Sequence, residues 1–275
     1  MKVFILLSLI IMIPFAGNHT TTTPPTFFQE QADEFCYVPN TSFKAGEEVT
    51  MKVYYSTLGI YIGAGEAKFS VGLSKMNGRP VYHCLGVGTS YSFFDKFFRV
   101  RDRYESYIDT ATMLPVKFIR NVDEDGYKIY NNVTFNHENR TAVTTNGLFK
   151  VTPCIQDVIS SVYYARNIDF SKYRKGEKIK FDMFLDDEVY NMYIKYEGKE
   201  TVKTRYGKFR AIKFKPLLIK GSIFEGGEKM NVWISDDKNR ILLRAESPIA
   251  VGSIKVDMMG YRNLRHPLTS LISVR

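Results

Sequence analysis

The chain has 275 residues, is 44% hydrophobic and carries a formal net charge of +9 at pH 7. No segment after the start of the chain is apolar enough to cross a membrane, which excludes further spanning helices, and the length suffices for a sizeable core without disulfide or metal staples. The basic balance favours anionic partners, namely lipid head groups, acidic glycans or nucleic acid; the alternative is that the charge serves solubility alone.

Residues 1–17 have the order of a secretory signal peptide. Met1 and Lys2 give a positive start, residues 3–15 form an apolar run, and Ala16 and Gly17 follow as small residues. The run is shorter than the ~20 residues that span a bilayer. The cleavage pattern is imperfect, so an uncleaved anchor stays open as an alternative. We expect an exported protein, for which nucleic acid is not a partner.

Residues 18–42 are rich in Pro and Thr, which predicts a flexible tether, with folded sequence from Phe43. Cys36, Cys84 and Cys154 remain in an oxidising compartment, where three cysteines form one disulfide and leave one thiol. Cys84 lies inside an apolar strand pattern and is expected to be a buried thiol. Cys36 with Cys154 is therefore the favoured pair, although connectivity does not follow from sequence alone.

Alternation of apolar and polar residues with period two predicts an all-β antiparallel fold. Asn77-Gly78, Asp125-Gly126 and Asn146-Gly147 are tight-turn signals between such segments. Apolar residues at helical spacing over 156–167, after Pro153, predict one helix, and a shorter helical turn is expected over 92–97. The predicted strands cover 49–55, 65–72, 80–88, 98–108, 114–122, 127–135 and 142–151.

The halves of the chain resemble each other on either side of the predicted helix. Four landmarks recur in the same order and at nearly the same spacing: 46–51 with 176–181, 77–79 with 206–208, 107–109 with 233–235, and 114–117 with 241–244. Together they predict two similar curved β units, about 43–151 and 174–262, with the helix between them. The units form either one continuous roll or two facing sheets, and the sequence does not choose.

Motifs that carry chemistry are missing from the sequence. It has no zinc-binding His-Glu-x-x-His pair, no Gly-x-Ser-x-Gly elbow and no phosphate-binding Gly-rich loop. We therefore predict no catalytic residue, metal or cofactor. One acidic cluster, Asp186, Asp187 and Glu188, precedes several tyrosines and is the sole candidate for a glycan-acting hydrolase.

Basic and aromatic residues near position 100 form the predicted ligand site. Arg99, Arg101 and Arg103 alternate along one strand and project from one sheet face, where they grip a phosphate or carboxylate, or pair with Asp and Glu in a structural ladder. Beside them lies an aromatic run that either contacts an apolar ligand or membrane surface, or plugs the open end of a roll. Its phenylalanines are Phe93, Phe94, Phe97 and Phe98.

Several segments resemble domain-of-unknown-function family 3108, whose members are exported proteins of Gram-negative bacteria. The resemblance covers nearly all of the sequence after the predicted signal, and it implies export and a β-rich fold without any activity or site residue. The segments that carry it are 43–47, 100–106, 157–166, 184–190, 206–210, 233–240 and 251–256. A looser similarity of plan connects repeated β units of this kind with envelope lipoprotein-carrier folds, which is analogy alone.

The sequence thus predicts an envelope binding protein of the periplasm or the outer-membrane periphery. Its ligand is expected to be amphipathic or anionic, such as a lipid or an acidic glycan, with peripheral membrane contact as a further expectation. The alternatives are a scaffold that holds an envelope protein complex together and, third, the glycan-acting hydrolase. A binding protein requires a deep apolar cavity, and a scaffold an exposed patch.

Overall fold

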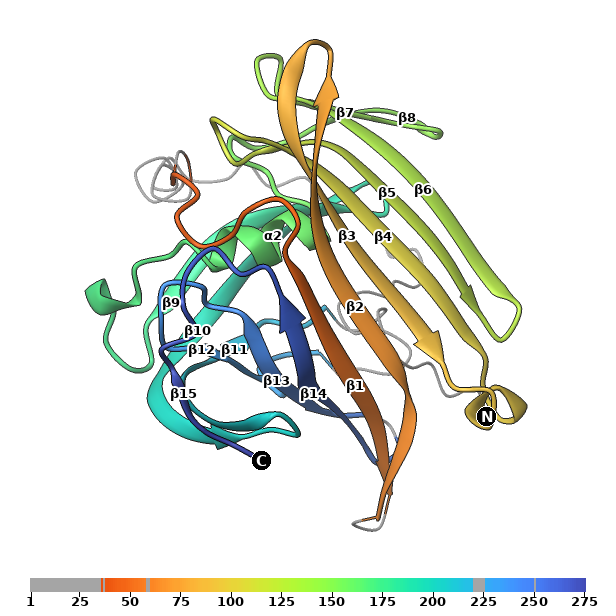
Figure 1. The fold of residues 1–275 in the computed structure, drawn as a ribbon. Helices are drawn as coiled ribbons and strands as arrows, with labels where there is room; N and C mark the ends of the chain where they lie inside the picture. Colours follow the sequence, from red (N-terminus) through yellow and green to blue (C-terminus); the bar gives the residue numbers. More distant parts are fainter. Residues whose placement is uncertain (1–35, 37, 58–59, 220–225, 250) are drawn as a thin grey trace.

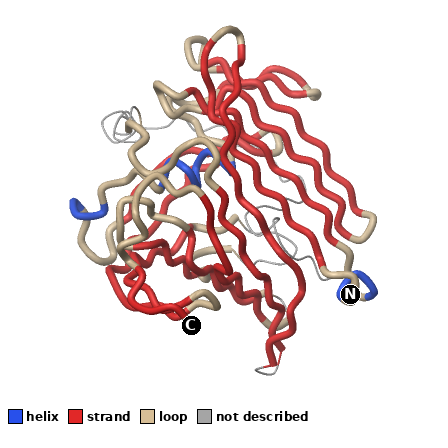
Figure 2. Tube along the Cα trace, in the orientation of Figure 1, coloured by secondary structure: helices blue, strands red, loops and turns tan. Residues whose placement is uncertain are grey.

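The computed structural model describes residues 36, 38–57, 60–219, 226–249 and 251–275, so the predicted signal peptide and most of the predicted tether lie outside the described residues. Within them, one antiparallel sheet of 15 strands accounts for most of the fold (Figures 1 and 2). The predicted all-β antiparallel class is confirmed. No helix in the described ranges is long and apolar enough to cross a membrane.

The first β unit contains the six strands that the alternating pattern predicts, and a short hairpin extends it. Its strands are β1 (Glu48–Thr57), β2 (Ile60–Met76), β3 (Arg79–Ser90), β4 (Val100–Asp109), β5 (Pro115–Glu124) and β6 (Tyr127–Asn136). The predicted strand over 142–151 is instead the hairpin of β7 (Thr141–Thr144) and β8 (Gly147–Lys150), because Thr145 and Asn146 form a two-residue turn inside it. The expected turn signal Asn146-Gly147 is thus displaced by one residue, and Gly147 begins β8.

The second β unit repeats this antiparallel arrangement. Its strands are β9 (Lys178–Leu185), β10 (Glu188–Lys203), β11 (Gly207–Pro216), β12 (Asn231–Ser235), β13 (Leu242–Pro248) and β14 (Ser253–Arg262). A last strand, β15 (Leu271–Val274), pairs with the start of β11. Strand β1 pairs with β14, which joins the two units into one continuous sheet with β8 and β9 at its ends. Of the two predicted arrangements, the structure has the continuous roll.

Backbone hydrogen bonds recur at matched positions of the two units. Gly46 and Gly176 both have positive φ, 87° and 94°, a conformation that glycine adopts without strain. The Gly46 N–H donates to Val71 O and the Gly176 N–H donates to Tyr196 O, each at 2.7 Å. These glycines open β1 and β9, so the sequence landmark corresponds to the same local structure in each unit.

A second matched bond lies at the turn that follows the fourth strand of each unit. Asp109 N–H donates to Leu114 O in the first unit, and Ser235 N–H donates to Ile241 O in the second, both at 2.9 Å. The two turns connect β4 to β5 and β12 to β13. The sequence repeat therefore extends to the backbone geometry of its turns.

Helix α2 (Val158–Ala165) lies inside the curve of the sheet, where it contacts β3, β4 and β9 (Figure 1). Asp157 is its N-cap, since its side chain accepts hydrogen bonds from the N–H groups of Ile159 and Ser160. The Ser160 hydroxyl accepts in return from Asp157 N–H, which completes a capping box. This local signal explains why a chain dominated by strands forms a helix here. Two short 3-10 helices also occur, η4 (Phe94–Lys96) and η5 (Phe170–Lys172).

The two ends of the sheet meet through the turn between β9 and β10. Phe184 packs edge-on against Phe135, with ring centroids 6.0 Å apart. The Arg120 guanidinium on β5 is fully buried and forms an ion pair with Asp186 at this turn. A parallel bridge between Gln156 and Met183 joins the edge of β9 to the segment before α2. These contacts bring the two ends of the open sheet close together at the β9–β10 turn.

The folded region begins before Phe43, contrary to the predicted tether boundary. Thr41 and Ser42 N–H groups donate to the side-chain oxygen of Asn167 at 2.8 and 3.2 Å, and the Ser42 hydroxyl donates to Arg166 O at 2.6 Å. Ser42 is fully buried as a result. Thr41 and Ser42 are polar, and their tertiary hydrogen bonds to the residues that follow α2 leave no pattern in the sequence, while Val38 packs against the core.

Candidate functional site

A cavity of about 200 Å³ lies between the inner face of the sheet and helix α2. Strands of both units and the helix contribute to its wall. The residues that line it are Ala67, Phe69, Tyr104, Val158, Ile159, Ser161, Val162, Ala165, Arg166, Phe181, Met183, Met192, Ile194, Phe214, Pro216, Leu217, Leu218, Met230, Val232, Ile234, Arg240, Leu242, Ala245 and Val256.

The wall is almost entirely apolar. Apart from the Tyr104 phenol, its polar side chains are Ser161, Arg166 and Arg240. The Ser161 hydroxyl is satisfied within the helix, where it donates to Val158 O at 2.8 Å. Several apolar wall residues are half-buried in spite of their position inside the fold, among them Phe69, Val162 and Phe181.

An unfilled space of this kind is costly for a protein core. The space is partly open to solvent, and its apolar wall lacks the van der Waals contacts that a bound apolar group would supply. The cavity also exceeds the ~150 Å³ that suffices to bind benzene in an apolar core. Its volume and lining are suited to an apolar chemical group.

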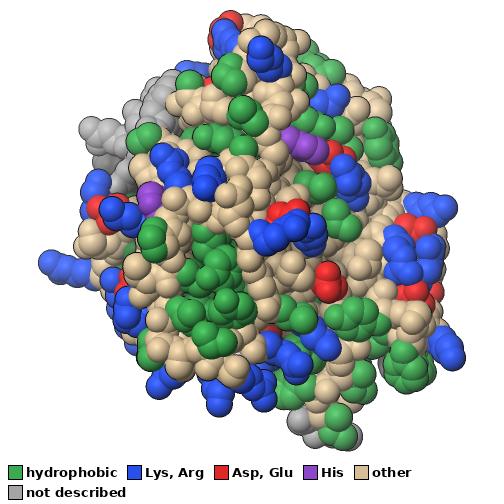
Figure 3. Space-filling view, in the orientation of Figure 1, with side chains coloured by type: hydrophobic (Ala, Val, Ile, Leu, Met, Phe, Trp, Pro, Cys, Tyr) green, Lys and Arg blue, Asp and Glu red, His purple; other side chains and the backbone are tan. Residues whose placement is uncertain are grey.

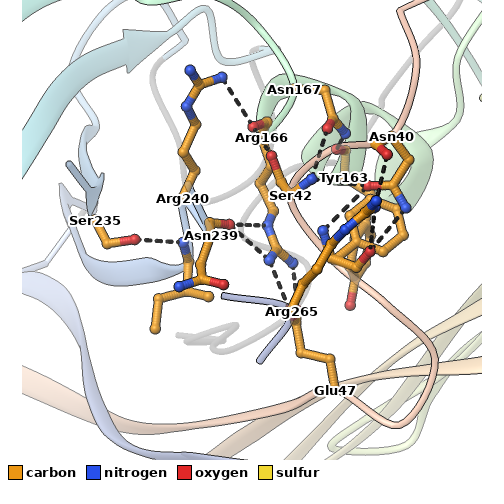
Figure 4. A network of polar contacts seen from close by, with 12 residues as sticks. Asn40, Ser42, Glu47, Tyr163, Arg166, Asn167, Ser235, Asn239, Arg240 and Arg265 are labelled. Carbon is orange, nitrogen blue, oxygen red and sulfur yellow. Dashed lines mark hydrogen bonds and ion pairs between the residues drawn. The ribbon is translucent and has the colours of Figure 1, made fainter. Parts of the chain in front are cut away.

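A buried ion pair fixes the end of α2 that borders the cavity (Figure 4). Arg166 Nη1 and Nη2 donate to the two carboxylate oxygens of Glu47 at 2.6 and 2.9 Å. Arg166 Nε also donates to Asn239 O at 3.1 Å, in the turn between β12 and β13. Both charged side chains are buried, and the bidentate geometry with a further carbonyl partner satisfies the guanidinium. One contact set therefore connects the first unit, the helix and the second unit.

At the other end of helix α2, desolvation changes the pKa of the N-cap residue Asp157. Asp157 is fully buried, and burial raises the pKa of its carboxyl to about 7, although hydrogen bonds from Ser106, Ser160 and Ile159 oppose the shift. The Ser106 hydroxyl lies 2.6 Å from Asp157 Oδ2. This places a carboxyl that titrates near neutral pH at the N-terminus of α2.

The three predicted ligand-binding arginines already have carboxylate partners. Arg99 pairs with Asp123 and Arg101 with Asp95, both at 2.6 Å. The hydrogen bond from Arg101 lowers the pKa of the Asp95 carboxyl. Arg103 pairs with Glu105 at 2.7 Å. The contacts match the structural-ladder alternative, and basic side chains on the face shown in Figure 3 are scattered among acidic ones.

These arginines also face away from the cavity. Tyr104 lines the cavity, and its neighbours along β4, Arg103 and Glu105, project to the opposite face of the sheet. The structure therefore does not bring the predicted arginines and the cavity together.

The four predicted phenylalanines divide into two pairs. Phe94 and Phe98 are buried in the core at the η4 turn. Phe93 and Phe97 are 63% and 70% exposed, with ring centroids 5.6 Å apart. One pair thus packs in the core, and the other is exposed at the surface.

The predicted acidic cluster supports the fold at the β9–β10 turn. Asp186 binds Arg120, and burial raises the pKa of its carboxyl despite that ion pair. Asp187 accepts from the Asn146 side chain at 2.5 Å, and Glu188 accepts from the Tyr190 hydroxyl at 2.9 Å. Each carboxylate thus has a hydrogen-bond or ion-pair partner at the junction of the two sheet ends.

The cysteines have the positions expected from the sequence. Cys36 and Cys154 form a disulfide, with their Cα atoms 5.4 Å apart, and Cys84 is a free, fully buried thiol. Burial raises the pKa of the Cys84 thiol well above its usual value, which makes it unreactive. No group of three or more His, Cys, Asp or Glu side chains in the described part of the chain is arranged to hold a metal ion.

The cavity itself was missed by sequence reasoning. Its wall combines β9 and β10 residues such as Met183 and Met192 with residues of the first unit, such as Phe69, that lie more than 100 positions earlier in the sequence. The sequence of the helix contains one signal for the cavity. Val162 is apolar and lies beside the helix face formed by Ile159 and Tyr163, so the apolar stripe of the helix is wider than a single packing surface needs.

A family model described as "Protein of unknown function (DUF3108)" matches residues 37–259, which is most of the chain. The chain belongs to this family. The DUF3108 match includes β1 to β13, α2 and most of β14, and therefore the whole cavity wall. No curated protein matches the sequence.

Solved structures that match this DUF3108 chain have low sequence identity to it. A beta-barrel-like protein of domain of unknown function DUF1849 from Brucella abortus has a TM-score of 0.52 and 8% identity, with 82% of this chain and 100% of that chain covered. A candidate lipoprotein from Parabacteroides distasonis has a TM-score of 0.35 and 14% identity, with 81% of this chain and 100% of that chain covered. A candidate exported protein from Bacteroides fragilis, with a YmcC-like fold, has a TM-score of 0.35 and 11% identity over 82% of this chain and 99% of that chain. The first similarity supports the open, barrel-like fold, and the other two add nothing to the argument.

Proposed function

We propose that this protein is an exported binding protein whose cavity, between the sheet and helix α2, holds the apolar part of an amphipathic ligand. The observation that carries the proposal is the lining of that cavity, to which both β units and α2 contribute apolar side chains and few polar groups. Burial of apolar ligand surface there gains about 0.8 kcal/mol for each methylene group. The apolar wall favours a lipid over an acidic glycan.

The cavity volume limits the class of ligand. Pockets for whole drug-sized ligands measure ~300–1,000 Å³, and this cavity, at about 200 Å³, is smaller. It therefore suits a single acyl chain or a comparable apolar group, with the remainder of the ligand outside. A lipid with several chains would place one of them in the cavity.

Export is supported by the signal-like order of residues 1–17 and by the cysteine arrangement. A disulfide between Cys36 and Cys154 forms and persists in an oxidising compartment. The periplasm or the outer-membrane periphery is the compartment that we propose. An acyl-chain ligand is consistent with that location, since membranes supply such chains.

A surface contact with a membrane or an envelope protein is the second candidate function. Phe93 and Phe97 are largely exposed, and so are Ile60 and Tyr61 near the β1–β2 turn. Exposed apolar side chains of this size favour contact with another apolar surface. Under this alternative the protein is a scaffold, and a variant with a filled cavity retains full function.

Titration calorimetry with dodecanol tests the proposal without involving charge. We expect the wild-type protein, stripped of endogenous lipid, to bind dodecanol, and Ala67→Phe to bind it at least tenfold more weakly because the new ring occupies the cavity. Leu73→Phe, on the same strand but 64% exposed, is the matched control and should bind as the wild type does. Absence of dodecanol binding to the wild type, or equal binding by all three proteins, would overturn the proposal.

A further inference from the structure

The cavity wall contains a cation whose surroundings differ from those of the other arginines of the interior. Arg120 and Arg166 are buried, and each has a carboxylate partner, Asp186 and Glu47 respectively. Arg240 also lines the cavity and is half-buried. Within the described residues, no carboxylate oxygen lies within 4.0 Å of its guanidinium. A partly desolvated cation without a counter-ion is energetically unfavourable unless a ligand supplies one.

The hydrogen bonds of Arg240 use one edge of its guanidinium. Nη1 donates to Arg166 O at 3.2 Å and to Ile168 O, which are carbonyls at and just beyond the C-terminal end of α2 (Figure 4). A cation at this position also suits the negative end of the helix dipole. The guanidinium carbon of Arg240 also lies over the Phe170 ring, 5.8 Å from the ring centroid, in a cation–π contact.

The opposite edge of this guanidinium is free to bind an anion. Nε and Nη2 of Arg240 make no hydrogen bond to the described residues. A guanidinium presents these two groups in parallel, which is the geometry that grips a carboxylate or phosphate in bidentate fashion.

Nearby acidic residues do not neutralise Arg240 directly. Asp169, Asp236 and Asp237 act on it at longer range. Asp236 pairs with Lys199 at 2.9 Å, and Asp237 accepts from the Ser235 hydroxyl, also at 2.9 Å. Asp169 accepts from Ser171. Each carboxylate thus has a polar partner of its own, and the free edge of Arg240 stays without one.

We propose that Arg240 binds the anionic head group of the ligand, a carboxylate or a phosphate, while the acyl chain fills the cavity. This inference rests on the proposed function, because it assigns the class of ligand for the same cavity. The assigned ligand is a single-chain anionic amphiphile, such as a fatty acid or a phosphate ester that carries one hydrocarbon chain. The apolar wall accounts for the chain, and the cation in that wall accounts for the charged end.

Arg240 has a structural role at the end of α2 as well, so the test must separate the two roles. The measured quantity is the ratio of affinities for dodecanoate and dodecanol, which share a chain and differ in the head group. We expect the wild type to prefer dodecanoate by at least tenfold, the effect of a hydrogen-bonded ionic contact. Arg240→Gln keeps donors for the helix carbonyls but lacks the charge, and it should bind both compounds about equally. Arg265→Gln is the matched control, because Arg265 donates to the carbonyls of Asn40 and Phe43 outside the cavity, and its ratio should equal that of the wild type.

The outcomes separate this inference from the proposed function. If the wild type binds neither compound, the proposed function fails. If it binds dodecanol as tightly as dodecanoate, or if Arg240→Gln retains the preference, the head-group assignment is overturned and the cavity proposal stands. A loss of preference in Arg265→Gln that equals the loss in Arg240→Gln also overturns it, since the effect is then one of overall charge.

A second variant and a second probe complete the test. Arg240→Lys keeps a cation at the helix end but lacks the planar fork, so it should lose the preference severalfold, and it replaces Arg240→Gln if that variant does not fold. An unchanged ratio in a folded Arg240→Lys variant would contradict bidentate binding. Dodecyl phosphate distinguishes the sources of the anion: tighter binding than dodecanoate assigns a lipid phosphate, and weaker binding assigns a carboxylate.

Discussion

Glu47 and Arg166 lie 119 positions apart in the sequence and meet in a bidentate, buried ion pair beside helix α2. Glu47 precedes β1, and Arg166 follows the helix, so the pair holds α2 against the first strand of the sheet. Because Arg166 also lines the cavity, the same contact fixes part of the cavity wall. The stability of this pair therefore bears on the shape of the candidate site.

Removal of one partner of this pair should be far more damaging than removal of both. Glu47→Leu leaves the Arg166 guanidinium buried without a counter-ion and should lower the free energy of unfolding by about 3–5 kcal/mol. The double variant Glu47→Leu with Arg166→Met should recover much of that loss, and urea unfolding of the wild type, both single variants and the double variant measures the coupling. Additive losses would show that the two side chains do not stabilise the fold as a pair.

The Asp157 carboxyl should make stability depend on pH in an unusual direction. Its pKa in the folded protein is about 7, above the ordinary value of 3.8, so the folded state holds the proton more tightly than the unfolded state. The contribution of the Asp157 carboxyl to the free energy of unfolding is therefore fully present below pH ~4 and is lost as pH rises towards 7. The total loss is on the order of 4 kcal/mol.

Asp157→Asn provides the matched comparison for this effect. An Asn side chain still accepts from the helix N–H groups and can donate to Ser106, so it resembles the protonated carboxyl. We expect the variant to match the wild type near pH 4 and to exceed it in stability near pH 8, as measured by urea unfolding across that range. A stability difference that does not change with pH would mean that Asp157 is ionised throughout.

Thiol counting should distinguish the three cysteines. A thiol reagent should modify none in the native protein, one after unfolding without reductant, and three after unfolding with reductant, because Cys84 is buried and Cys36 is bonded to Cys154. The bond connects residues 118 positions apart, so Cys36→Ser should cost about 2–5 kcal/mol in unfolding free energy. Three reactive thiols in the unreduced, unfolded protein would contradict the disulfide, and a single reactive thiol that peptide mapping places at Cys36 or Cys154 would contradict this pairing.

Neighbouring phenylalanines should differ sharply in their contribution to stability. Phe98 is 3% exposed, and Phe98→Ala should cost about 3–5 kcal/mol through the lost contacts and the cavity left behind. Phe97 is 70% exposed, and Phe97→Ala should change stability by less than about 0.5 kcal/mol. Thermal and urea unfolding of the two variants measure this difference, and similar losses would indicate that Phe97 is covered by another part of the protein.

The length of the acyl chain that the cavity accepts should be limited. Affinity for primary alcohols should rise about fourfold for each added methylene group while the chain remains inside the apolar wall, and then level off. Titration calorimetry of an alcohol series locates that limit. A steady rise without a limit would place the chain on an open surface and not in a cavity.

The all-β antiparallel fold class could be predicted from the sequence, because alternating apolar residues and turn signals such as Asn77-Gly78 are local properties of the sequence. The repeat was visible for the same reason, since Gly46 and Gly176 open matched strands. The pairing of β1 with β14 was not predictable, because it joins segments from opposite ends of the folded chain and has no local signature. The short tether segment with Ser42 was misassigned because its hydrogen bonds to Asn167 and Arg166 depend on tertiary structure.

The residues of the candidate site were much harder to predict from the sequence than the fold was. The run from Arg99 to Arg103 was conspicuous, yet Asp123, Asp95 and Glu105 pair with those arginines in the structure. The functional arginine that we propose, Arg240, follows Asn239 in an ordinary turn sequence, and its distinction is that no carboxylate among the described residues forms an ion pair with it. A missing partner is a property of three-dimensional surroundings, which explains why sequence spacing points to the wrong arginines for this cavity.

The central claim, that the cavity carries an acyl chain, is tested most directly by native mass spectrometry of the mature protein purified gently from its own envelope. We predict additional mass on the chain that organic solvent removes, and that the extract contains an anionic single-chain lipid or a lipid that places one chain in the cavity. The Ala67→Phe variant, purified in the same way, should carry little or none of it. A wild-type protein whose mass equals that of the bare chain, or equal lipid on Ala67→Phe and the wild type, would contradict the claim and favour the scaffold alternative.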